Sequence, residues 1–169
     1  MSYVSPYEMF IFEDYSFDAS TRTASFHYSF DGKRKFKETV EFAKYLPAVN
    51  KSDYDIDLLD AALRLSFYLA GTSYYKAFPT TKVLFKAGQP DQGQADFLQQ
   101  VYTHGLSQFI FENYLNLENI AVFSAEGYEK NQIGYSGTGA LVLQSGGKDS
   151  LLLASLLEEK GKSYTPWYI

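Results

Sequence analysis

The sequence predicts an α+β fold in two parts. An N-terminal antiparallel β-meander with helices is followed by the first strand–helix–strand unit of an α/β domain. Three observations support this. Apolar and polar residues alternate in short runs from Tyr7 to about Ala43, and apolar residues then recur at helical spacing. Near its end the chain has a continuous apolar run, a glycine-rich loop, another helical tract and a last apolar run.

The predicted meander has three strands with a period of two residues, YEMFIFED, TASFHYSFD and KFKETVEFA, separated by DAST and DGK. Asp31 and Gly32 suit a tight hairpin turn that needs positive φ. The chain has 15 Tyr and 14 Phe. Packing between the sheet and the helices is the simplest use for these rings, and stacking of some of them on a nucleobase is the alternative.

Helical spacing then predicts a helix that includes Leu58 to Leu69, with Asp55 or Asp57 as its N-cap and Gly71 at its end.

A short strand, Lys82 to Phe85, follows Pro79 and stops at the loop AGQPDQG. A second helical tract runs from Phe97 to Leu115, and Gly105 predicts a bend or a break within it.

These patterns divide the chain into an N-terminal α+β domain (1–123), a linker rich in Gly, Ser and Asn (124–139) and the start of an α/β domain (140–169). The last segment reads as the strand ALVLQ, a helix ended by Gly161, and the strand SYTPWYI. A doubly wound nucleotide-binding domain usually needs about 100 to 200 residues. We therefore expect the α/β domain to be truncated in this chain.

Composition and charge exclude several classes of site. A net charge of -5 and a pI near 5.0 disfavour binding along a nucleic acid. With no cysteine and only two histidines, His27 and His104, we expect no disulfide, no thiolate nucleophile and no structural zinc. The N-terminus lacks the pattern of a secretory signal, and no apolar run reaches membrane-spanning length, so we expect a cytoplasmic protein.

The segment LVLQSGGKDS, residues 141–150, predicts a phosphate-binding loop. Gly146 and Gly147 permit backbone conformations in which successive N–H groups turn towards one anion. The helix that follows adds unpaired N–H groups and the positive end of its dipole. Ser145 and Ser150 add hydroxyl donors.

Lys148 and Asp149 are the candidate catalytic residues of this loop. The ammonium group of Lys148 can reach a phosphate or move with the loop. A carboxylate beside polyphosphate is useful where it caps the helix or helps to hold Mg²⁺ between phosphate oxygens. We therefore predict magnesium, held indirectly through Asp149.

Three other catalytic or nucleotide-binding motifs match the sequence only in part. A Walker A loop requires Ser or Thr after its Gly-Lys pair, and Asp149 stands at that position. Ser145–Lys148 and Ser73–Lys76 both match S-x-x-K, yet the companion motifs S-D-N and K-T-G are absent from the sequence. GYSGTG approaches a nucleophile elbow but has Thr138 where the final Gly is needed.

SGGKDS between an apolar strand and an amphipathic helix resembles the PP-loop of ATP pyrophosphatases, which adenylate a carbonyl or carboxyl oxygen and release pyrophosphate. The resemblance covers residues 141–169 and implies ATP and Mg²⁺ as cofactors. Relatives with this loop include tRNA thiolases, lysidine synthases, deazaguanine nitrile synthases and glutaminase-fed synthetases. The residues that carry over as the ATP-phosphate site are Ser145, Gly146, Gly147, Lys148, Asp149 and Ser150.

KETVEFA, GTSYYKAFP, HGLSQFIFENYL and SGGKDS, in this order, resemble the N-terminal half of the UDP-N-acetylmuramoyl-L-alanyl-L-glutamate epimerases of peptidoglycan biosynthesis. The resemblance implies a nucleotide-linked peptide substrate. In that family, ATP converts the terminal glutamate carboxylate into an acyl adenylate, which acidifies the α-proton so that the stereocentre can be inverted. The residues indicate no base for this proton.

Ser73, Tyr74, Tyr75 and Lys76 are a second candidate site, for substrate. A lysine behind two tyrosines at a helix end can face a phosphate or a carboxylate, although a solvated lysine beside two packed rings is the commoner arrangement.

We expect this chain alone to lack turnover and to expose the edge of its last strand, which favours a homodimer. Two alternatives stay open. The first, within the PP-loop class, is a deazaguanine nitrile synthase or an amide-forming ligase. The second, outside that class, is a noncatalytic binding module.

Overall fold

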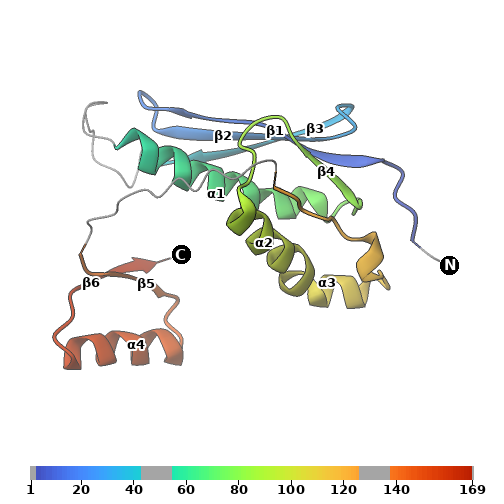
Figure 1. Cartoon of the computed structure of the whole chain (residues 1–169). Coiled ribbons are helices and arrows are strands. Elements are labelled where there is room, and N and C mark those ends of the chain that lie inside the picture. Colours follow the sequence, from blue (N-terminus) through green and yellow to red (C-terminus); the bar gives the residue numbers. More distant parts are fainter. Residues whose placement is uncertain (1–2, 43–54, 126–137, 169) are drawn as a thin grey trace. The chain divides into compact units, whose positions relative to one another are not determined.

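The computed structural model describes residues 3–42, 55–125 and 138–168, and the chain divides into two compact units, Met1–Asn131 and Gln132–Ile169. Figure 1 shows the helices and strands of both units. Most of the predicted linker 124–139, and with it most of the GYSGTG segment, lies outside the described residues.

The first unit is built on a mixed four-stranded sheet in the order β3-β2-β1-β4. Strands β1 (Met9–Asp18), β2 (Thr23–Phe30) and β3 (Arg34–Glu41) form the predicted antiparallel meander. Strand β4 (Lys82–Phe85) exists as predicted, and it pairs in parallel with β1. That parallel pairing joins segments about 70 residues apart, which no local pattern indicates.

The turn between β2 and β3 confirms the hairpin prediction. Asp31 and Gly32 have φ of 52° and 68°, and the N–H of Lys33 donates to the carbonyl of Phe30 at 2.9 Å. The Asp31 carboxylate also accepts the N–H of Met9 at 2.9 Å, which ties the turn to the start of β1.

Helix α1 (Ile56–Tyr75) begins as predicted at Asp55, whose carboxylate accepts the N–H of Leu58 at 3.0 Å. The prediction that Gly71 ends this helix is wrong. A Cβ at Gly71 would lie 2.7 Å from Cε1 of Phe12 on β1, so glycine stands there to let the helix approach the sheet.

The second helical tract breaks where Gly105 predicts it. Helix α2 (Gln92–Gln100) passes into a π-helical turn, η2 (Val101–Gly105), and helix α3 (Ser107–Glu112) follows. A short 3₁₀ turn, η3 (Leu117–Asn119), comes next.

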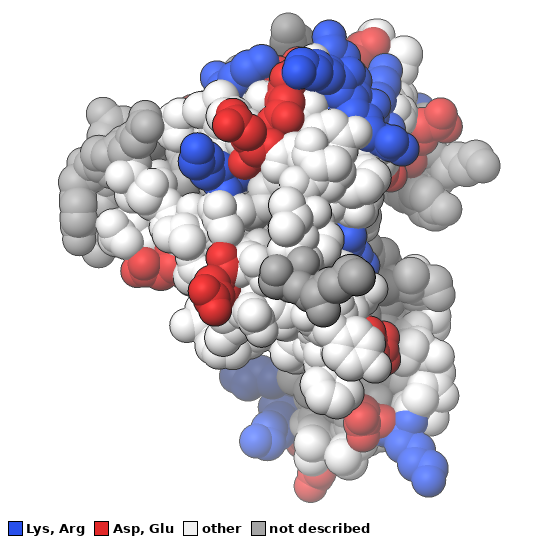
Figure 2. Space-filling model, turned by 90° about the vertical axis from the view of Figure 1, so that its right-hand side faces the viewer, with Lys and Arg blue, Asp and Glu red and all other residues white. Residues whose placement is uncertain are grey.

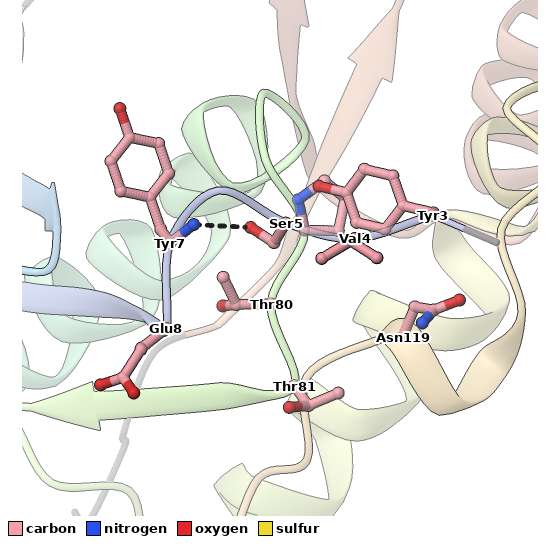
Figure 3. Close-up of a pocket in the computed structure, with 9 residues that line it drawn as sticks. Tyr3, Val4, Ser5, Tyr7, Glu8, Thr80, Thr81 and Asn119 are labelled. Carbon is pink, nitrogen blue, oxygen red and sulfur yellow. Dashed lines mark hydrogen bonds between the residues drawn. The ribbon is translucent and has the colours of Figure 1, made fainter. Parts of the chain in front are cut away.

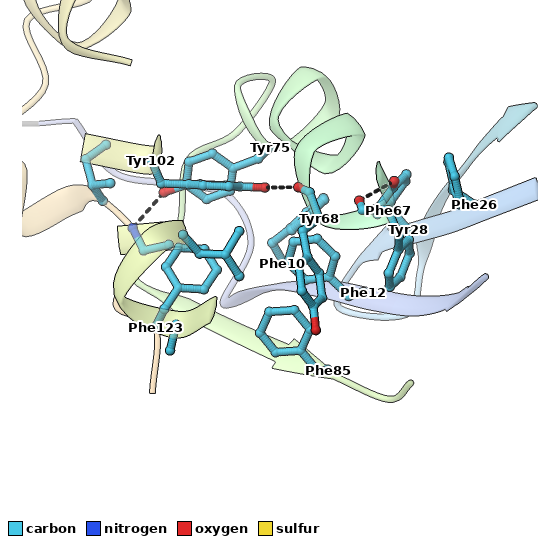
Figure 4. Close-up of a cluster of buried hydrophobic side chains, with 14 of the residues drawn as sticks. Phe10, Phe12, Phe26, Tyr28, Phe67, Tyr68, Tyr75, Phe85, Tyr102 and Phe123 are labelled. Carbon is cyan, nitrogen blue, oxygen red and sulfur yellow. Dashed lines mark hydrogen bonds between the residues drawn. The ribbon is translucent and has the colours of Figure 1, made fainter. Parts of the chain in front are cut away.

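Aromatic rings fill the space between the sheet and the helices (Figure 4). Phe12 stacks on Phe85 with centroids 4.4 Å apart, and the Tyr28 hydroxyl donates to the carbonyl of Phe67 at 2.7 Å. The hydroxyl groups of the buried tyrosines therefore form hydrogen bonds with backbone groups. The rings labelled in the figure are Phe10, Phe12, Phe26, Tyr28, Phe67, Tyr68, Tyr75, Phe85, Tyr102 and Phe123.

The second unit is a parallel strand–helix–strand unit, as the sequence predicts. It consists of β5 (Ala140–Gln144), α4 (Lys148–Glu159) and β6 (Tyr164–Tyr168), and the two strands pair in parallel. Gly161, at φ 61°, closes the helix, and the N–H of Lys162 donates to a carbonyl in its last turn at 2.9 Å.

The described part of this unit leaves apolar surface open. Val142 is buried, whereas Leu141 and Leu143, which point to the other face of β5, are 65% and 52% exposed. Parallel sheets normally bury both faces. The exposed leucines of α4 are Leu151, Leu152, Leu153 and Leu156.

Candidate functional site

The loop at 145–150 has the strand-to-helix geometry that a phosphate site requires. Strand β5 ends at Gln144, Gly146 adopts φ 76°, and Gly147 is the N-cap of α4 with φ −78° and ψ 167°. The loop therefore turns sharply and does not continue as an extended strand. Positive φ at Gly146 explains why a glycine stands there.

Both glycines leave space beside the backbone. A Cβ built on Gly146 would meet nothing within 4 Å, and one built on Gly147 would meet only the Ser145 hydroxyl oxygen, at 3.7 Å. A side chain at either position would project into this space. The loop thus leaves an open space, called the cradle below, beside the backbone of Gly146 and Gly147.

The first turn of α4 supplies donors to this cradle. In the described part of the chain, no protein acceptor binds the backbone N–H groups of Gly147, Lys148 or Asp149. The first helical hydrogen bond runs from the N–H of Leu151 to the carbonyl of Gly147, at 3.2 Å. Unpaired N–H groups together with the helix dipole attract an anion.

Two polar contacts hold the loop in shape. The Ser150 hydroxyl donates to the carbonyl of Gly147 at 2.9 Å, and the Gln144 side-chain amide donates to the carbonyl of Ser150 at 3.1 Å. Ser150 thus uses its proton within the loop, and its role as a phosphate donor stays a prediction. Gln144 is not among the residues predicted for this site, although a polar residue at the end of an apolar strand is a signal that the sequence contains.

Lys148 and Asp149 are exposed, and their side chains form no hydrogen bond or salt bridge with the residues that the structure describes. Asp149 therefore does not act as a helix cap. Its charge still favours the helix N-terminus, since it lies in the first turn.

Among the described residues, no three His, Cys, Asp or Glu side chains gather in a metal cluster. Mg²⁺ commonly binds through one or two carboxylates together with substrate phosphates. Asp149 fits such a mode, in which the phosphates supply most of the ligands.

The second candidate site, Ser73–Lys76, forms the end of α1. Tyr75 is fully buried: its hydroxyl donates to the carbonyl of Thr80 at 2.9 Å and accepts the N–H of Ala121 at 2.8 Å. Burial raises the pKa of this hydroxyl. Tyr75 therefore holds the segment after α1 against the core.

Tyr74 has different partners. Its hydroxyl donates to the Glu38 carboxylate on β3, and its ring stacks on Tyr28 with centroids 5.2 Å apart. The hydrogen bond to Glu38, assisted by burial, raises the pKa of Tyr74 to about 12. Ser73 and Lys76 are exposed at the helix surface. The two rings do not converge on one ligand, and a substrate role for this segment stays a prediction.

A hollow of about 240 Å³ lies close to this segment in the fold (Figure 3). The N–H of Tyr7 donates to the Ser5 hydroxyl oxygen there, and the Thr80 hydroxyl donates to the carbonyl of Lys82. Its walls come together through the pairing of β1 with β4, which the sequence does not indicate. The lining residues are Tyr3, Val4, Ser5, Tyr7, Glu8, Pro79, Thr80, Thr81 and Asn119.

In the part of the chain that the structure describes, no helix has the length and apolar character needed to cross a membrane.

The geometry defines an α+β domain with a mixed sheet, followed in the chain by a parallel strand–helix–strand unit whose loop amides have no acceptor among the described residues. Comparison with protein families matches residues 1–169 to the MurL N-terminal domain. The chain belongs to this family.

Three relatives carry the name UDP-N-acetyl-alpha-D-muramoyl-L-alanyl-L-glutamate epimerase. The protein of Salinispora tropica is 30% identical over 168 residues, which cover 96% of this chain and 36% of that protein. The protein of a Micromonospora species is 28% identical over 173 residues, which cover 96% of this chain and 37% of that protein. The protein of Xanthomonas oryzae is 30% identical over 154 residues, which cover 90% of this chain and 34% of that protein.

The chain thus spans about a third of the length of these relatives. The match supports the predicted resemblance to the N-terminal part of the epimerases. No solved structure matches the chain significantly.

Proposed function

We propose that this chain is the N-terminal part of an ATP-dependent epimerase that inverts the terminal L-glutamate of UDP-N-acetylmuramoyl-L-alanyl-L-glutamate. In this proposal the PP-loop at 145–150 holds the phosphates of ATP, and AMP and pyrophosphate are the products. The observation that carries it is the glycine cradle at the N-terminus of α4, whose amides have no protein acceptor in the described part. The names of the three relatives support the substrate.

ATP would supply the adenylyl group that turns the glutamate carboxylate into an acyl adenylate, a stronger carbon acid than the carboxylate itself. The chain's own residues bind and orient. The amides of Gly147, Lys148 and Asp149 bind phosphate oxygens in the cradle, and the loop backbone fixes their direction before ATP binds.

The two charged residues have separate tasks in this proposal. Lys148, free of protein partners among the described residues, neutralises charge on the departing pyrophosphate. Asp149 would help to hold Mg²⁺, and the ion would neutralise charge on the phosphates. Ser150 and Gln144 keep the cradle in its conformation through their contacts with the loop backbone.

In this proposal, residues 138–168 form only the phosphate-binding part of the ATP site. Residues 138–168 provide two strands and one helix, and several of their apolar side chains are exposed. An adenine pocket requires more covered apolar surface than this. We therefore expect the 169-residue chain to bind ATP weakly and to show no turnover.

The alternatives within the PP-loop class receive less support. A deazaguanine nitrile synthase or an amide-forming ligase would share the loop, yet all three relatives carry the epimerase name. If the chain belonged to a noncatalytic binding module, the full-length protein would release no pyrophosphate.

An NMR titration of the 169-residue chain with ATP and Mg²⁺ tests the loop. We expect the amide resonances of residues 146–149 to shift, with an affinity reduced tenfold or more in Lys148→Ala. Lys160→Ala, at the other end of α4, is the matched control and should bind like the unchanged chain. Absence of shifts in the loop at millimolar ATP would exclude the proposed phosphate site.

The activity is tested in a protein of the relatives' full length that carries this sequence as its N-terminal third. Pyrophosphate release should require the L-glutamate substrate and should be lost in Asp149→Asn with folding retained. Release that continues unchanged in this variant would contradict the assigned role of Asp149.

A further inference from the structure

The face of the sheet turned away from α1 carries a β-bulge. Phe12 pairs with Tyr28 and Asp14 pairs with His27, so Glu13 is an extra residue in β1. Phe12 and Tyr15 both pack on the core. Two residues thus lie between core-facing positions where one is normal, and the bulge turns both carboxylates to the outer face.

The Glu13 carboxylate is compensated by the protein. Lys86 contacts it at 2.6 Å, and the fully buried Ser29 hydroxyl donates to it. Burial would raise its pKa, but the bonds from Lys86 and Ser29 and the charges of Lys86 and Lys35 outweigh that effect and lower it. Glu13 therefore stays charged and paired.

Asp14 holds His27. Its carboxylate oxygen lies 2.6 Å from Nδ1 of the ring, which fixes the orientation of the imidazole and leaves Nε2 for another partner. The histidine side chain is 35% exposed. The pair borders a hollow of about 200 Å³, whose lining residues are Glu13, Asp14, His27, Tyr28, Lys35 and Phe36.

Strand β3 brings cations to the same face. Lys35 pairs across the sheet with Ser29, and Lys37 pairs with His27. Neither lysine forms a salt bridge among the described residues. Figure 2 shows Lys and Arg side chains gathered at the top of its view, over the sheet, with carboxylates among them. The hollow thus combines the ammonium group of Lys35, which forms no salt bridge among the described residues, with a carboxylate acceptor and an imidazole.

We propose that this hollow binds the carboxylate-bearing end of an acidic peptide, as in a glutamyl residue in peptide linkage. Lys35 binds the carboxylate, Asp14 accepts a peptide N–H, and Nε2 of His27 contacts the same end of the ligand. The identity of the ligand rests on the function proposed above, while the binding chemistry rests on this face alone.

The mixed charge of the hollow decides between ligand classes. A phosphate group can bind Lys35 through its oxygens, but it has no N–H group to donate to the Asp14 carboxylate. A dipeptide end offers both a carboxylate and an N–H donor, which match Lys35 and Asp14 respectively.

Titration of the 169-residue chain with L-alanyl-L-glutamate, followed by NMR, tests this site. We expect shifts in the amides of His27 and Lys35, and a tenfold or greater loss of affinity in Lys35→Gln. Lys82→Gln changes a lysine of the same sheet that does not line the hollow, and it should leave affinity unchanged. Circular dichroism checks that each variant is folded.

Three outcomes would overturn the proposal: no binding of the dipeptide at millimolar concentration, equal affinity in Lys35→Gln, or inorganic phosphate binding as tightly as the dipeptide. The experiment contains no nucleotide. A negative result with the dipeptide therefore does not affect the proposed phosphate site, and a negative result with ATP does not affect the proposed peptide site.

Discussion

Replacement of Gly71 by alanine tests whether helix α1 depends on close approach to the sheet. The new Cβ would lie 2.7 Å from Cε1 of Phe12 and 3.2 Å from the hydroxyl oxygen of Tyr102. Carbon atoms in contact prefer about 3.5 to 4.0 Å, so the shortfall is close to one ångström. Phe12 and Tyr102 are fully buried and cannot move aside into solvent.

Two effects of opposite sign set the magnitude for Gly71→Ala. Alanine gains about 1 kcal/mol over glycine in a helix interior. Overpacking of a well-packed core costs about 1 to 3 kcal/mol, and the short contact with a stacked ring favours the upper end. We expect a net loss of about 2 kcal/mol in the free energy of unfolding of the first unit.

Urea unfolding measures this change in two signals. Near-ultraviolet circular dichroism reports mainly the tyrosine-rich first unit, and the fluorescence of Trp167, the single tryptophan, reports the second. Gly105→Ala is the matched control, because its Cβ would meet only Cγ1 of Val101, at an ordinary 3.8 Å. We expect the first transition to shift in Gly71→Ala alone. Equal or greater stability of Gly71→Ala would refute the close-approach argument.

Three further predictions follow from named contacts. Tyr75→Phe leaves a buried N–H and a buried carbonyl without their partner and should cost about 1 to 3 kcal/mol of unfolding free energy, measured in urea. Hydrogen bonds from Ser20 lower the pKa of Asp18 to about 2. The stability that the ionised Asp18 contributes is therefore present above about pH 4 and is lost as the pH falls through about 2. In Asp18→Asn, the free energy of unfolding should fall less steeply with decreasing pH in this range, as measured by urea unfolding at a series of pH values. Gly147→Val fills the cradle at an ordinary negative φ, so the ATP-induced NMR shifts should vanish while the free energy of unfolding, measured in urea, stays within about 0.5 kcal/mol of that of the unchanged chain.

The candidate sites differ in how far the sequence alone located them. The six residues of SGGKDS are contiguous, and a strand-to-helix turn needs only local pattern, so their geometry was foreseen. Ser73–Lys76 is also contiguous, yet successive residues on a helix point about 100° apart. Tyr74 therefore reaches β3 while Tyr75 enters the core.

The sequence by itself determined the meander, the Asp31–Gly32 turn, the break at Gly105 and the glycine turn from β5 into α4, and it limited the cap of α1 to Asp55 or Asp57. Each depends on residues within a few positions of one another, where backbone sterics and local hydrogen bonds decide the conformation. Only the tertiary structure decided the pairing of β4 with β1, the need for Gly71 and the hollow beside the Glu13 bulge. These features depend on contacts between segments far apart in the chain, and such contacts are set by how whole surfaces pack.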